Sequence, residues 1–334
     1  MPVNTKTIKR RIKSIGSTKK ITKAMEMISA VKMRRAVGNV LATRNYSNLA
    51  WEMLSEIAKK TDLSQHSLLA VRPVKRIAVI LITSNRGLAG GFGSRLLQAT
   101  HSYINKVQHG VILNEAQRSE ESLSQSQNGQ RSFANAQDDS KGITVDIILT
   151  GRQGKKIYHK FGHNVVAEFD KLDLTTHIEE ILPMTQMAIA DYISGKYDAI
   201  VVAYTDFVSA LLQTPKLKQI LPIVNADAEE NNTPPPQWRG QGEDSSDQIG
   251  HYLFEPSTKD VLNLLLPRLI EMQIYQAILE SDASEHSARM MAMRSASDAA
   301  EDMIKELNYS FNKARQAAIT QEISEIVGGA AALG

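Results

Sequence analysis

The sequence predicts a mainly parallel α/β domain, its sheet flanked by helices, joined to a long antiparallel coiled coil of the N- and C-terminal helices. Two observations predict this fold. Both ends of the chain are almost free of helix-breaking residues, and the middle alternates apolar strand-like segments with helical ones. Of the 334 residues 42% are hydrophobic but only 5% are aromatic, a composition that favours long helices.

The C-terminal stretch, residues 268–327, contains neither Pro nor Gly. Its apolar and small residues recur at alternating steps of four and three, the spacing of a coiled-coil seam. The seam positions are Leu279, Ala283, His286, Met290, Met293, Ser297, Ala300, Ile304, Leu307, Phe311, Ala314 and Ala318. A helix this long needs a partner along most of its span, and the small seam residues indicate close packing that buries little area.

The N-terminal stretch supplies that partner. Between residues 3 and 71 there is no Pro, and only Gly16 and Gly38 interrupt a helical composition. Its seam begins with Ile8, Ile12 and Ile15. After a slip in register, we expect the seam to resume at Ile21, Met25, Ile28 and Val31. Because both helices project from the middle of the chain, their pairing is expected to be antiparallel.

The middle of the chain predicts the α/β domain, since its apolar runs are typical of strands buried on both faces. We expect strands at 75–83, 143–150, 165–169 and 197–204, helices at 92–108 and 176–194, and an extended edge segment at 208–223. Two segments, 114–141 and 226–250, are polar insertions with almost nothing to bury. The predicted domains are an N-terminal coiled-coil helix at 1–71, the α/β domain at 72–256 and a C-terminal coiled-coil helix at 257–334.

A glycine-rich loop, TSNRGLAGGFGS at 83–94, follows the first predicted strand and looks like a phosphate-binding turn. It lacks the Lys of the GxxxxGK[ST] pattern, and its glycines do not have the GxGxxG spacing of dinucleotide sites. We therefore expect a tight strand-to-helix turn and no nucleotide.

Residues for catalysis or metal binding are not gathered anywhere in the sequence. There are no cysteines, which excludes thiolate metal sites and thiol nucleophiles. The histidines are scattered; His159 and His163 stand at a metal-clip spacing, but no acidic third ligand is fixed near them. The sequence thus predicts no catalytic residue, no cofactor and no metal.

Charge is concentrated at the N-terminus, where residues 1–60 carry many more Lys and Arg than Asp and Glu. Such a helix suits an acidic protein surface, a solvated charged face, or a nucleic acid or anionic lipid. The nucleic-acid alternative lacks the stacking aromatics and docking module that it needs. No signal core precedes the helix, and no apolar run approaches the ~20 residues that span a bilayer.

Several segments resemble the gamma subunit of F-type ATP synthases. They are KITKAMEMISAVKMRRA (20–36), TSNRGLAGG (83–91), GRQG (151–154), YLFEPS (252–257), LLPRLIEMQIYQAILES (265–281) and the run from SEHSARMM to GGAAAL (284–333). The resemblance covers nearly the whole chain apart from the two insertions. Ala89 departs from many relatives, which have Cys there.

The resemblance implies a central rotor shaft, one copy per complex, that couples proton flow to the catalytic cycle of the beta subunits. Its partners would be the alpha3beta3 ring, the epsilon subunit and the membrane c-ring, with no nucleic acid and no direct nucleotide binding. The subunit would be non-catalytic, without a cofactor, and peripheral to the cytoplasmic face of a bacterial inner membrane.

The resemblance also implies which residues meet the ring. By match to the family motifs these are Lys23, Met25, Glu26, Met27, Arg289, Met293, Arg294, Arg315, Gln316, Thr320 and Glu322. The loop Arg86, Gly87, Leu88, Ala89, Gly90 and Gly91 would lie at the base of the shaft, with its glycines allowing close approach to another protein. Two rival classes remain, a free-standing coiled coil that binds nucleic acid and a nucleotide-binding enzyme.

Overall fold

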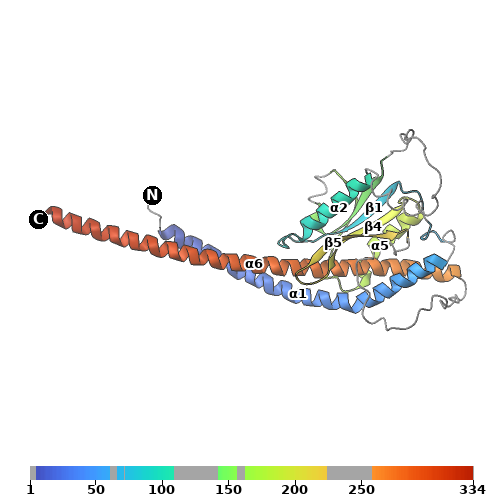
Figure 1. Ribbon diagram of the computed structural model, residues 1–334, viewed down its shortest axis with the longest axis horizontal. Coiled ribbons are helices and arrows are strands. Elements are labelled where there is room, and N and C mark those ends of the chain that lie inside the picture. The colour runs from blue at the N-terminus through green and yellow to red at the C-terminus, as the bar shows by residue number, and fades with distance from the viewer. Residues whose placement is uncertain are drawn as a thin grey trace, which may run out of the picture.

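The computed structural model describes residues 5–60, 66–70, 72–108, 142–155, 162–223 and 258–333. The predicted insertions at 114–141 and 226–250 lie outside these residues. Two long helices, α1 (Thr5–Lys60) and α6 (Thr258–Leu333), lie side by side and project far from an α/β domain at one end (Figure 1). No helix in the described ranges has a segment long and apolar enough to cross a bilayer.

The two helices run antiparallel, as predicted. Lys19 pairs with Glu301 at 2.9 Å, near the middle of the shaft. Thr43 donates a hydrogen bond to Gln276 at 2.6 Å, at the level of the domain. Because residue numbers rise along one helix as they fall along the other, the start of α1 lies beside the C-terminal half of α6.

The predicted seam of α6 is confirmed as far as Ala314. Positions 279, 283, 286, 293, 297 and 300 are buried, and positions 290, 304, 307, 311 and 314 are half-buried. All the remaining side chains between 301 and 320, including Ala318, are exposed. The seam ends there because α1 begins at Thr5, and α6 continues beyond it alone (Figure 1).

The predicted slip in the seam of α1 is wrong. Ile21, Ile28 and Val31 face outward, with 61%, 57% and 50% of their surface exposed. The seam continues unbroken from Ile8 at steps of three and four, and the buried or half-buried side chains are Ile8, Ile12, Ile15, Lys19, Thr22, Met25, Ser29, Met33, Ala36 and Val40. The reason is packing, because small and hydroxyl side chains fit the close approach to α6 better than Ile or Val.

A five-stranded sheet forms the domain, in the order β3-β2-β1-β4-β5. The strands are β1 (Arg76–Ile82), β2 (Thr144–Thr150), β3 (Asn164–Phe169), β4 (Ala199–Phe207) and β5 (Gln213–Leu221). β1 to β4 pair in parallel, whereas β5 is an antiparallel edge strand. The predicted mainly parallel sheet and its edge segment are thus confirmed.

Helices cover both faces of the sheet. Because strand side chains alternate between faces, Ile77, Val79 and Leu81 of β1 pack toward α2 (Phe92–Gln108). Ala78, Ile80 and Ile82 pack toward α5 (Leu182–Ile193) and α6. The predicted helix 176–194 divides into η2 (Ile178–Glu180) and α5 (Leu182–Ile193), because Pro183 fits only the first turn of a helix.

Candidate functional site

β1 is the topological switch point of the sheet, since the chain turns to β2 on one side and β4 on the other. In open α/β sheets, ligands bind in the crevice at the carboxyl ends of the strands that flank such a point. The glycine loop 83–91 leaves β1 into this crevice. What fills the crevice therefore decides whether the glycine loop is part of a nucleotide site or a structural turn.

The glycine loop packs on this chain's own helix α6. Gly90 has a φ of 55°, and a Cβ added to it would lie 3.6 Å from the Cβ of Ala292. Ala89 is buried against Phe92 and Ala288. This close contact is within the chain, and the expected approach of the loop to another protein stays a prediction; Arg86 and Leu88 are exposed beside it.

Helix α6 occupies the crevice itself. Ser284 donates a hydrogen bond to the carbonyl of Thr205, at the end of β4, at 3.1 Å. The guanidinium of Arg289 donates to the carbonyl of Arg86 at 3.2 Å and to that of Gly87 at 3.4 Å. The position where related sheets hold a phosphate is filled by a helix of the shaft.

A buried charged cluster ties α6 to the loop after β3. Lys171, whose side chain is 2% exposed, lies 2.7 Å from Asp282 and 3.0 Å from Glu285. Glu285 accepts a further charged hydrogen bond from Arg289 at 2.7 Å. The backbone N–H of Thr175 donates to the other oxygen of Asp282 at 2.8 Å. Two cations thus balance two carboxylates inside the protein, which is the condition under which buried charges are tolerated.

The pKa values of Lys171 and Glu285 reflect this balance, whereas burial raises the pKa of Asp282. Burial alone would lower the pKa of Lys171, but the carboxylates of Asp282 and Glu285 outweigh it and raise that pKa. Burial opposes ionisation of Glu285, yet Lys171 and Arg289 lower its pKa. We infer that Lys171 and Glu285 stay charged throughout the physiological range.

His286 adds a neutral member to the cluster. Its Nε2 donates to the carbonyl of Asp173 at 2.7 Å, and its Nδ1 accepts from Arg289 at 3.3 Å. Burial lowers the pKa of His286 below its ordinary value of 6.5, and the positive charge of Arg289 acts in the same direction. The imidazole therefore acts as a hydrogen-bonded bridge between the loop and the helix.

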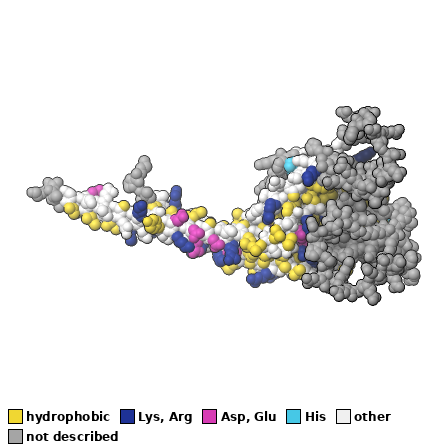
Figure 2. Space-filling model, in the orientation of Figure 1, with side chains coloured by type: hydrophobic (Ala, Val, Ile, Leu, Met, Phe, Trp, Pro, Cys, Tyr) yellow, Lys and Arg dark blue, Asp and Glu magenta, His cyan; other side chains and the backbone are white. Residues whose placement is uncertain are grey.

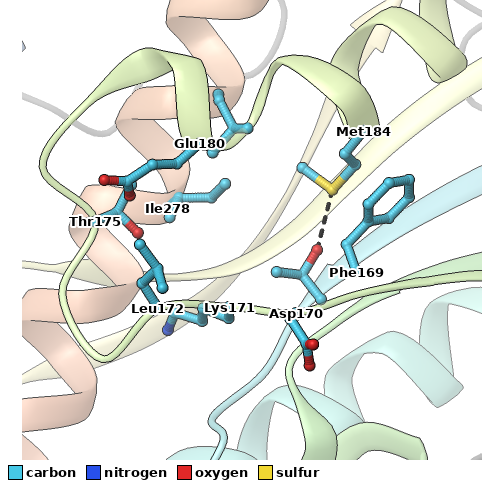
Figure 3. A pocket seen from close by; sticks show the side chains of 10 residues that line it. Phe169, Asp170, Lys171, Leu172, Thr175, Glu180, Met184 and Ile278 are labelled. Carbon is cyan, nitrogen blue, oxygen red and sulfur yellow. Dashed lines mark hydrogen bonds between the residues drawn. The ribbon is translucent and has the colours of Figure 1, made fainter.

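A small cavity lies beside this cluster at the ends of β2 and β3 (Figure 3). Lys171, Leu172, Glu180 and Ile278 line it, and the hydroxyl of Thr150 donates to the sulfur of Met184 at 3.0 Å. Its volume is about 50 Å³, whereas ligand pockets measure roughly 300 Å³ or more. It has room for water and none for a nucleotide.

Metal ligands are not assembled in the described part of the chain. No group of three or more His, Asp or Glu side chains there has the arrangement of a metal site. His163 contacts His101 at 3.2 Å between ring nitrogens, while its predicted companion His159 lies outside the described residues.

The predicted ring-contact residues on α1 lie near the middle of the shaft. Lys23 and Met27 are exposed, while Met25 and Glu26 are half-buried against α6. Lys23 also pairs with Glu26 at 3.0 Å. Two of the four side chains are therefore available on the outer surface.

Two of the predicted contact residues on α6 are buried within this chain. Arg289 is 8% exposed and Met293 is 5% exposed, so both face the interior of this chain. Arg289 is held by the glycine loop and Glu285, whereas Met293 occupies the seam with α1. Their neighbour Arg294 is exposed.

The predicted contacts near the end of α6 are all exposed. Arg315, Gln316, Thr320 and Glu322 lie beyond the reach of α1, on the part of the helix that continues alone. The hydroxyl of Thr320 donates to the carbonyl of Gln316 at 3.0 Å, within the helix. Their role as contacts to a ring stays a prediction.

Sequence reasoning missed Lys171, Asp282 and Glu285. The signal that could have found them is the run ESDASEHSAR at 280–289, which is polar on every side although it lies inside a long seam helix. Such a run is typical of a solvated helix, and only the fold shows that it is buried.

Comparison with known proteins identifies the family. A family model described as ATP synthase matches residues 4–333. The ATP synthase gamma chain of Legionella pneumophila (strain Corby) is 35% identical over 331 residues, which cover 98% of this chain and 99% of that one. The ATP synthase gamma chain of Roseiflexus castenholzii is 38% identical over 332 residues, covering 99% and 98%.

Solved structures share the fold. A chain of the Euglena gracilis mitochondrial ATP synthase matches with a TM-score of 0.57 at 14% identity, covering 98% of this chain and 94% of that chain. A chain from the central stalk and c-ring of the Tetrahymena thermophila mitochondrial ATP synthase matches with a TM-score of 0.51 at 19% identity, covering 83% and 99%. With its helical shaft, its occupied crevice and its full-length relatives, this chain belongs to the gamma-chain family of the ATP synthases.

Proposed function

We propose that this chain is the central rotor shaft of an F-type ATP synthase and transmits rotation between the membrane c-ring and the alpha3beta3 ring. It performs no chemistry, and the catalytic sites that it drives belong to the beta subunits. The observation that carries the proposal is the shaft of α1 and α6, which projects from the domain with apolar side chains on its outer surface.

The surface of the shaft suits a partner that it touches at many angles. Apolar and basic side chains are interspersed along it (Figure 2). Met27 is adaptable in shape and polarizable, and Ile28 and Val31 offer shallow apolar contact. Exposed cations such as Arg34 and Arg35 attract acidic loops of a ring at long range, without fixing one orientation.

The end of α6 is proposed as the part that enters the ring. Arg315, Gln316, Thr320 and Glu322 offer hydrogen-bonding groups on a single exposed helix. Such groups bond to a ring subunit at one angle and release it at the next. The lower part of the domain would hold the epsilon subunit and the c-ring, with one copy of the chain per complex.

The experiment is co-expression of the chain with alpha, beta and epsilon chains of the same source. We expect a complex with one gamma chain that hydrolyses ATP, located at the cytoplasmic face of the inner membrane when the membrane subunits are present. The isolated chain should bind no ATP. The proposal fails if the chain does not join those subunits but binds DNA with a steep dependence on salt.

A further inference from the structure

One segment of α6, residues 280–289, is buried on every side although it is mostly polar. Its buried polar side chains are Glu280, Ser281, Asp282, Ser284, Glu285, His286, Ser287 and Arg289. A helix that is buried all round is normally apolar all round, and burying a polar group is unfavourable unless it is bonded. The segment therefore requires an explanation beyond packing.

The partners of this segment come from each structure that surrounds it. Arg44 of α1 pairs with Glu280 at 3.0 Å. Ser284 bonds to the end of β4, and Ser287 donates to the carbonyl of Ala210, in the β4–β5 turn, at 2.6 Å.

The other two partners are the loops of the crevice. Lys171 binds Asp282 and Glu285, and the glycine loop binds Arg289. These bonds therefore act on α6 from several directions around its axis.

Directional bonds resist motions that apolar packing permits. Apolar contact is non-directional, so a helix of alanines and leucines retains most of its burial after a small turn about its axis. Hydrogen bonds weaken steeply with angle, and buried ion pairs are hardly screened by salt. A turn of α6 would therefore strain its bonds to Lys171, Thr205, Ala210 and the glycine loop together.

We propose that residues 280–289 form a polar joint that prevents α6 from turning or sliding within the α/β domain. Lys171 and Arg289 are its charged anchors. Because the domain and the shaft are at opposite ends of the path of rotation, this joint is the place where torque passes between them. The proposal rests on the proposed function of the chain as a rotor.

The test is Lys171→Met in the complete complex, reconstituted in vesicles, with ATP hydrolysis and ATP-driven proton pumping measured together. We expect hydrolysis to continue and the protons pumped per ATP to fall by roughly half or more, because two buried carboxylates lose the cation that they share. The matched control is Lys155→Met, which removes a Lys–Glu168 pair of 2.7 Å that is exposed. It should leave the pumping ratio unchanged.

A disulfide across the joint separates torque transfer from a general loss of stability. The chain has no cysteine of its own, and a Cβ at Gly90 lies 3.6 Å from that of Ala292, which is a disulfide distance. In a Lys171→Met complex that also carries Gly90→Cys and Ala292→Cys, oxidation should restore the pumping ratio, and reduction should remove it again. The same cysteine pair with Lys171 intact is the control for strain at Gly90.

Two results would contradict the proposed joint. One is an unchanged pumping ratio in an assembled Lys171→Met complex, and the other is a lowered pumping ratio that oxidation of the cysteine pair does not restore. If Lys171→Met does not assemble, the pumping ratio is measured in the milder double variant Ser284→Ala with Ser287→Ala. Its control is Ser194→Ala, since the hydroxyl of Ser194 makes an exposed hydrogen bond. Failure of the unaltered chain to assemble or to pump would instead reject the rotor function, so the two failures are distinguishable.

Discussion

Hydroxyl groups stand in the seam of this coiled coil at positions where larger apolar side chains are common. Thr22 of α1 and Ser297 of α6 are both buried, and their oxygens are 2.7 Å apart. Each hydroxyl is also placed to bond to a carbonyl of its own helix, at Lys19 and Met293. The pair brings the helices close without an unbonded polar group.

The Thr22–Ser297 pair gives the first prediction. Thr22→Val should cost about 1 kcal/mol of unfolding free energy, because it removes one partner of a buried hydrogen bond. The double variant Thr22→Val with Ser297→Ala should cost less than the sum of the two single changes. Urea unfolding followed by circular dichroism measures all three; strict additivity would mean that the hydroxyls do not interact.

His286 gives a prediction about pH. Its folded pKa lies below the ordinary 6.5, so between those values the unfolded chain binds more protons than the folded chain. Stability is therefore full above about pH 6.5 and falls as the pH drops toward the folded pKa. The groups that face the imidazole of His286 are the Asp173 carbonyl, Arg289, Glu285 and Asp282.

His286→Gln should flatten this decline, measured as the change in melting temperature between pH 7.5 and pH 5.5. The control is His177→Gln, since His177 is exposed, and it should keep the slope of the unaltered chain. Equal slopes in all three proteins would show that the neutral bridge of His286 does not contribute.

At the scale of elements, glycines at different places have opposite effects. Gly16 lies inside α1, and an added Cβ there would meet no atom within 4 Å. Gly151 ends β2 with a φ of 92°, and an added Cβ would collide with the backbone carbonyl of Thr83. One glycine costs helix stability, and the other is required by the turn.

Gly16→Ala should therefore stabilise the isolated chain by about 0.5–1 kcal/mol. Gly151→Ala should destabilise it by about 3 kcal/mol through backbone strain and collision. Thermal unfolding of the two variants measures both effects. A stabilising Gly151→Ala would contradict the geometry of the turn.

The sequence predicted the elements better than their interior contacts. The seam of α6 and the four parallel strands follow from periodicity and apolar runs, which are local signals. The seam of α1 was predicted only in part, because Ile21, Ile28 and Val31 look like core residues but face outward. Hydrophobicity alone cannot separate a seam from an exposed apolar surface.

The polar joint was not predicted from the sequence, for the opposite reason. Lys171 and Asp282 are far apart in the sequence, and each alone looks like a surface residue. Their burial depends on which helix fills the crevice of the sheet, which is a property of the whole fold. The glycine loop was correctly predicted as a turn from its missing Lys, but its partner, α6, required the structure.

On the scale of the whole molecule, the shaft separates residues that hold the chain together from residues that are free for partners. Ile8 belongs to the first set, being 5% exposed, whereas Ile28 and Val31 belong to the second. Ile28→Gln with Val31→Gln should change the stability of the isolated chain by no more than about 0.5 kcal/mol. The same pair should weaken its assembly with the alpha3beta3 ring.

Ile8→Gln is the contrasting variant and should cost about 2 kcal/mol of stability, since it places an amide in the seam. Urea unfolding of the isolated chain and titration of the ring with labelled chain measure the two effects separately. If Ile28→Gln with Val31→Gln left assembly unchanged, the outer stripe would not be a contact surface.

The antiparallel pairing also sets the order of events when the chain is made. Lys19 and Glu301 are 282 residues apart, so at a synthesis rate of ~5–20 residues per second the first helix leaves the ribosome roughly 15 to 60 s before its partner. During that interval α1 has no α6 to cover its seam, and the α/β domain cannot close its crevice. Helix α6, which is translated after the other described elements, completes both the shaft and the core of the domain, so a chain released before α6 lacks both.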